Sequence, residues 1–281
     1  MHRRIIALAT LLVLAASSGL AARELADAPE VRLLGFSPDG RYFAYEQYEE
    51  DGVSDAAVAA IDVIDRQTNR SVKGFPFGFL GMSKKDAEFP LRVGGHKIKV
   101  NTEQDVSVRL DALLKAVRAQ TKSQLAALKI GTSGRRLAGQ PITDRTPGGG
   151  KPEFVLSPTL PGPVPDLQRV YRVSTQIVPN DHESCVQNSK VQNHRIVVRL
   201  DAFEGGADES RGTPKASRKV EVPWEAGESE CAAVVRVTDV VEAPGKTGEE
   251  SHVVVVMLAI SWSGHAETSR YLAAFVPVPS P

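Results

Sequence analysis

The sequence predicts an α+β fold that is mainly antiparallel β-sheet or β-sandwich, with one long helix. Alternating or β-branched runs, separated by loops rich in Gly, Pro, Asp and Ser, fill the second half of the chain. A tight-turn sequence joins two short apolar runs near residue 40. One stretch, residues 102–130, repeats apolar residues at helical spacing. Many strands beside one helix indicate sheets that the helix covers.

The first hairpin is organised by the turn Ser37–Gly40. Pro38 presets φ for the second position of a tight turn, and Gly40 suits a position that needs a positive φ. The turn separates the predicted strands Val31–Phe36 and Arg41–Tyr48. In the second of these, side chains alternate with the period of a strand, so the sequence predicts a β-hairpin.

Four further segments complete the first half. Ala57–Asp65 is predicted to be a third strand. Phe75–Pro90 mixes aromatic residues with Gly and Pro without a period, so it is predicted to be irregular, with its aromatic rings packed on a neighbour; a ligand groove is the alternative. Thr102–Ile130 is predicted to be a helix whose apolar stripe packs across a sheet; binding of a partner protein is the alternative. Gly131–Pro152, rich in Gly and Pro, is predicted to be a linker.

The second half is predicted to consist of strands. They cover residues 170–178, 195–203, 219–222, 232–241, 252–260 and 270–278. Within them, Val253–Ile260 is a run of apolar residues of the kind that a fully buried strand carries. The predicted organisation is therefore a signal segment at 1–22, a hairpin region plus helix at 23–145, and a β-rich region at 146–281. The last region can form one unit with the N-terminal strands.

The N-terminal segment has the features of a secretory signal peptide. Basic residues at Arg3 and Arg4 precede the apolar run Ile5–Leu14, and small residues follow it. Cleavage is predicted after Ala21 or Ala22; the alternative is an uncleaved membrane anchor. Since no later stretch is long and apolar enough to span a bilayer, we expect a periplasmic or secreted protein with no stable membrane span in the mature chain.

The charge balance argues against nucleic acid as a partner. The chain has 34 basic and 34 acidic residues. Removal of residues 1–22 takes away Arg3 and Arg4 and no acid, which leaves 32 basic and 34 acidic residues and a formal charge of −2. Nucleic-acid-binding domains carry a basic excess, which this chain lacks.

The two cysteines, Cys185 and Cys231, are predicted to form a disulfide. An even number of cysteines in an exported chain favours a bridge, and two reduced, buried thiols are the alternative. His182 and His194 lie near Cys185 and are metal-type ligands. Structural zinc needs four protein ligands and catalytic zinc about three, and no obvious further ligand accompanies them. The sequence therefore predicts no metal and no cofactor.

Sequence patterns of catalysis give no stronger candidate. The chain has no Gly-x-Ser-x-Gly elbow. Asp62 and Asp65 are close in sequence, but their odd separation along a strand places them on opposite faces, so joint acid–base work is not expected. The catalytic residues stay unknown.

The hairpin motif carries a family resemblance. The motif consists of Phe36, Ser37, Pro38, Asp39, Gly40, Arg41 and Tyr42. With Ile61–Asp65 after it, it resembles one repeat of the β-propeller found in the translocation protein TolB. No series of repeats follows, and its one echo is Arg270–Phe275. The whole arrangement is more similar to the predicted secreted bacterial proteins of domain-of-unknown-function family 2259. That resemblance implies an exported protein and no mechanism.

These observations predict an exported interaction or binding protein without catalysis of its own. Its partner would be an envelope protein or a cell-wall component. One alternative is a metal-assisted hydrolase that uses the region of His182 and His194. A further alternative is a structural protein of the envelope.

Overall fold

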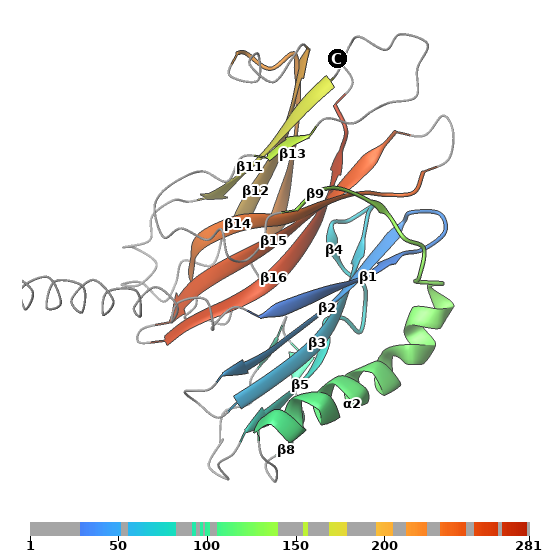
Figure 1. Ribbon diagram of the computed structural model, residues 1–281, viewed down its shortest axis with the longest axis vertical. Helices are drawn as coiled ribbons and strands as arrows, with labels where there is room; N and C mark the ends of the chain where they lie inside the picture. The colour runs from blue at the N-terminus through green and yellow to red at the C-terminus, as the bar shows by residue number, and fades with distance from the viewer. Residues whose placement is uncertain are drawn as a thin grey trace, which may run out of the picture.

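Three β-sheets and one helix are stacked as layers in a computed structural model of the chain (Figure 1). The structure describes residues 29–51, 56–82, 92–93, 96–97, 99–101, 106–139, 154–156, 169–178, 195–204, 212–223, 231–245, 250–263 and 266–279. The layer order is helix, first sheet, central sheet and third sheet. One apolar core joins the helix to the first sheet, a second joins the first sheet to the central sheet, and a third joins the central sheet to the third sheet. The predicted mainly β, α+β fold with antiparallel sheets is confirmed.

The first sheet contains the N-terminal hairpin. Its order is β1 (Glu30–Phe36), β2 (Tyr42–Asp51), β3 (Ala56–Asp65), β5 (Phe77–Met82) and β8 (Lys99–Asn101), and β4 (Arg70–Ser71) also pairs with β3. All pairs are antiparallel except β5–β8. A separate two-stranded sheet joins β6 (Arg92–Val93) and β7 (His96–Lys97).

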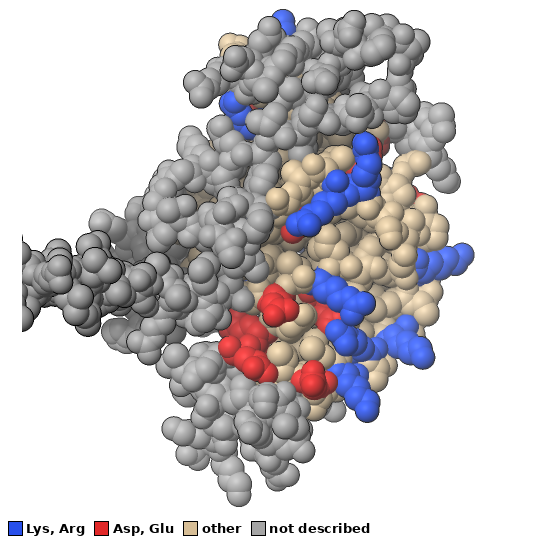
Figure 2. Space-filling view, viewed as in Figure 1, with Lys and Arg blue, Asp and Glu red and all other residues tan. Residues whose placement is uncertain are grey.

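Helix α2 (Val106–Ala127) covers the outer face of the first sheet. Its buried residues Leu113, Leu114 and Val117 pack on the alanine-rich strand β3 and on Ala44 of β2, so the prediction of a helix across a sheet is correct. The helix ends at Ala127, before the predicted end at Ile130, and Lys129 just beyond it has a positive φ of 54°. In Figure 2, basic side chains gather over the position of α2. The apolar side of the helix is therefore used within this chain.

The central sheet has the order β16 (Ala266–Pro277), β15 (His252–Ser263), β14 (Cys231–Glu242) and β9 (Arg135–Gly139). Its strand β15 is buried on both faces: Val253, Val255, Met257 and Ala259 face the third sheet, and Val254, Val256 and Leu258 face the first. This two-sided burial explains the continuous apolar run of the sequence. The third sheet has the order β10 (Phe154–Leu156), β11 (Arg169–Val178), β12 (Arg195–Glu204) and β13 (Ala216–Pro223).

Two predictions of local structure were wrong. Phe77–Met82 lies in the segment predicted to be irregular, yet it forms β5, because pairing with the long strand β3 overrides its weak alternation. Arg135–Gly139 lies in the predicted linker, yet it pairs with β14 as an edge strand. Within the described residues, no helix is long and apolar enough to cross a membrane.

Candidate functional site

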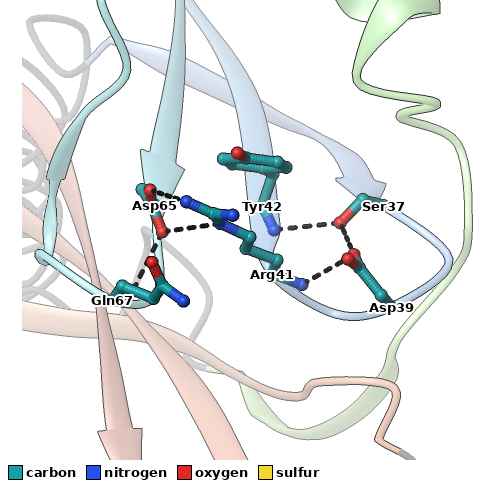
Figure 3. Close-up of polar contacts among 6 residues, drawn as sticks. All are labelled: Ser37, Asp39, Arg41, Tyr42, Asp65 and Gln67. Carbon is teal, nitrogen blue, oxygen red and sulfur yellow. Dashed lines mark hydrogen bonds and ion pairs between the residues drawn. The ribbon is translucent and has the colours of Figure 1, made fainter.

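The motif Phe36–Tyr42 forms a turn whose polar groups bind one another (Figure 3). The Ser37 hydroxyl donates to the Asp39 carboxylate at 2.6 Å and accepts from the N–H of Tyr42 at 2.9 Å. Asp39 also accepts from the N–H of Arg41 at 3.1 Å. The Ser37 hydrogen bond, followed by that of Arg41, lowers the pKa of Asp39. These polar groups are used in hydrogen bonds within the turn, so we assign them a role in the shape of the hairpin and not in binding a ligand.

Further contacts of the motif join it to other elements. The Arg41 guanidinium binds the Asp65 carboxylate at 3.4 and 3.1 Å, which ties the turn to the end of β3 (Figure 3). The N–H of Phe36 donates to the C=O of Thr132 at 2.7 Å, beyond the end of α2. The turn at Gly40 lies against Pro244, which follows β14. The motif is therefore a structural junction between the helix, the first sheet and the central sheet.

A pocket of about 60 Å³ lies where strand β16 meets the first sheet. We call it the edge pocket, and the residues that matter here are Tyr45, Gln47, Asp62, Asn69, Ser71 and Ala273. Among the strands that the structure describes, β16 is the end strand of the central sheet, and none pairs with the other side of its backbone. Such an edge needs other hydrogen-bond partners or open water.

Side chains of the first sheet bind two residues of this edge. The N–H of Tyr271 donates to Gln47 Oε1 at 2.8 Å, and the Tyr45 hydroxyl donates to the C=O of Tyr271 at 3.1 Å. The Asn69 carboxamide binds both backbone groups of Phe275, at 2.7 and 2.8 Å. Because alternate residues of a strand point their backbone groups to the same side, Ala273 points its N–H and C=O to this edge as well.

The Asp62 carboxyl group is buried in the wall of the edge pocket. It accepts hydrogen bonds from the Ser71 hydroxyl at 3.0 Å and the N–H of Val63 at 2.8 Å. The Tyr45 hydroxyl, 3.3 Å away, shares its one proton between Asp62 and the C=O of Tyr271. Burial raises its pKa to about 6, against the opposing effects of these bonds and of the charge on Arg270. Near neutral pH the pocket therefore holds a carboxylate, and at mildly acidic pH a carboxylic acid.

The other predicted site residues lie elsewhere. His182, Cys185 and His194 are outside the described residues, so the disulfide and the alternative metal site stay predictions. Cys231 is the first residue of β14. In the part of the chain that the structure describes, no group of three or more His, Cys, Asp or Glu residues could hold a metal ion. Asp62 and Asp65 have separate partners, Ser71 and Arg41.

The sequence did not point to the edge pocket. Asn69 has a positive φ of 52°, which asparagine tolerates in a turn, so its residue type is explained without a role in a pocket. The sequence similarity between Arg41–Tyr45 and Arg270–Phe275 was the one feature that connected these two strands before the structure was known. The structure packs these two strands together, with Phe43 and Tyr45 of β2 in the same core as Tyr271 and Phe275 of β16.

The comparisons with known proteins give no relative from which a function could be transferred. No family model, no curated protein and no solved structure matches the chain. The resemblance to domain-of-unknown-function family 2259 stays a prediction, and the function must be argued from the edge pocket.

Proposed function

We propose that the chain is an exported, non-catalytic binding protein that holds a polar group of its partner or ligand in the edge pocket. The observation that carries the proposal is that Ala273, whose N–H and C=O point to the open edge of β16, lines the pocket together with the buried Asp62. Export is argued from the signal-like residues 1–22.

The walls of the edge pocket are suited to recognition because other parts of the protein hold them in place. Tyr45, Gln47 and Asn69 are each fixed by hydrogen bonds to the backbone of β16, and Ser71 is fixed on Asp62. Groups that are positioned before binding lose little conformational freedom when a ligand arrives. The pocket is much smaller than a site for a whole drug-sized ligand, which takes about 300 Å³ or more. It suits one functional group of a larger envelope component.

A binding assay that compares the unaltered chain with a variant whose edge pocket is blocked by a larger side chain tests the proposal. The mature chain, residues 23–281, is incubated with an extract of the host envelope, and retained compounds are identified by mass spectrometry. We expect Ser71→Leu, which places a larger apolar side chain at the pocket, to reduce the retained ligand by about tenfold or more. The control Ser123→Leu adds the same side chain at an exposed position of α2 and should bind as the unaltered chain does.

Two results would overturn the proposal. One is equal retention by Ser71→Leu and Ser123→Leu, or no retained compound at all, which would remove the edge pocket as a binding site. The other is stoichiometric zinc in untagged protein, because it would favour the metal-assisted hydrolase over non-catalytic binding.

A further inference from the structure

The side chain of Asn69 shows how a carboxamide binds the edge of β16. Its Oδ1 accepts from the N–H of Phe275 at 2.7 Å, and its Nδ2 donates to the C=O of the same residue at 2.8 Å. Both bonds go to one residue because an extended residue points its N–H and C=O to the same side. The carboxamide matches this pair because its oxygen and one of its N–H groups also lie on one side.

Ala273 presents the same pair of backbone groups two residues earlier in the strand. The backbone N–H and C=O groups of Tyr271, Ala273 and Phe275 all point to the side of β16 that faces away from β15. Among the described residues, none bonds to the outward N–H or C=O of Ala273. Ala273 lines the edge pocket, whose volume of about 60 Å³ accommodates a group of a few heavy atoms. At Ala273, the pocket therefore offers the same backbone donor and acceptor that Asn69 binds at Phe275.

We propose that the edge pocket recognises a primary carboxamide, bound to Ala273 as Asn69 is bound to Phe275. The inference rests on the proposed function and names the chemistry of its ligand. A primary carboxamide has a second N–H group, and Asp62 supplies a carboxyl oxygen in the same pocket to accept it. A ring amide also carries its donor and acceptor on one side and belongs to the same class.

Other groups of similar size lack the required donor and acceptor. A carboxylate has acceptors only, so it leaves the C=O of Ala273 without a donor, and an amidinium has donors only. A trans peptide group carries its N–H and C=O on opposite sides and can satisfy one of the two. The charged side chains around the pocket, Asp62, Arg70 and Arg270, have both signs and so favour a neutral ligand.

Four small probes test the inference on the mature chain at pH 7. They are acetamide, acetate, acetamidinium and N-methylacetamide, each titrated into protein labelled with ¹⁵N-alanine while the amide signal of Ala273 is followed. We expect acetamide to shift this signal saturably, with a dissociation constant in roughly the millimolar range. The other three should bind at least about ten times more weakly, because each leaves a backbone group unpaired. The ring amide 2-pyrrolidone should behave as acetamide does.

The variant Ala273→Pro removes the outward N–H. Proline is tolerated in edge strands where its nitrogen faces away from the sheet, and the lost signal also assigns the Ala273 resonance. Saturation-transfer measurements should show that this variant no longer binds acetamide. If it does not fold, the comparison of probes on the unaltered chain decides alone.

Three outcomes would overturn the inference. Tightest binding of acetate would identify an anion site of Arg70 and Arg270. Tightest binding of acetamidinium would identify a site governed by Asp62, and no shift with any probe would mean that the pocket holds water only. The proposed function is tested separately. It stands if Ser71→Leu loses a ligand that the unaltered chain retains from the extract, even when acetamide does not bind. It fails if no such ligand is found.

Discussion

Asp62 links the edge pocket to the stability of the fold. Folding moves its carboxyl group out of water and places three hydrogen-bond donors around it. The removal from water is the larger effect, so the pKa rises from 3.8 to about 6. Below about pH 4 the group is protonated in both the folded and the unfolded chain. As the pH rises from about 4 to about 6, the unfolded chain ionises this group while the folded chain still holds it protonated, so stability falls, and the loss is complete once the pH has passed the folded pKa of about 6.

We predict that Asp62→Asn makes the free energy of unfolding less dependent on pH between about 4 and 7. The shift from 3.8 to about 6 corresponds to about 3 kcal/mol that the unaltered chain loses over this range and the neutral variant keeps. Urea unfolding at several pH values measures the difference. Burial also raises the pKa of Asp239, but this group is present in both proteins and cancels. An unchanged pH profile in the variant would contradict the assignment.

At the scale of the element, an ion pair within an apolar contact attaches α2 to the first sheet. Glu46 is fully buried in β2, and the Arg118 guanidinium of α2 binds both of its oxygens, at 2.7 to 3.1 Å. The sequence predicted the helix and its apolar stripe because both depend on local period. It did not predict the buried Glu46, because a charged residue becomes tolerable there only when Arg118, distant in sequence, covers it.

We predict that Arg118→Met lowers the free energy of unfolding by about 2 kcal/mol, because it leaves the buried Glu46 carboxylate without a cation. The value lies below that of a fully buried pair, since the Arg118 side chain is 47% exposed. The double variant Arg118→Met with Glu46→Gln should recover part of the loss. Denaturant unfolding measures both, and Lys122→Met, which changes an exposed cation of the same helix, is the control. Equal effects of Arg118→Met and Lys122→Met would contradict the prediction.

At the scale of the whole molecule, the limits of sequence reasoning follow from distance along the chain. Most strands of the second half were predictable because alternation and turns are local signals. β5 and β9 were not, because each is stabilised by pairing with a longer strand, β3 or β14. The edge pocket needs β2, β3, β4 and β16 together, and the groups that our proposal places at its ligand are the backbone N–H and C=O of Ala273. Every residue except proline has both groups, so the residue type at a position cannot predict that its backbone will form a binding site.

The junction at Gly40 determines how the first sheet docks on the central sheet. Gly40 has a φ of +65°, and a Cβ atom there would lie 1.9 Å from the carbonyl oxygen of Pro244. We predict that Gly40→Ala lowers the free energy of unfolding by about 2–3 kcal/mol, because the turn must lose its conformation or move away from Pro244. The matched control is Gly245→Ala, three residues beyond the end of β14, where an added Cβ meets nothing within 4 Å. Thermal and urea unfolding compare the two. A Gly40→Ala protein as stable as Gly245→Ala would mean that the hairpin motif does not hold the two sheets together.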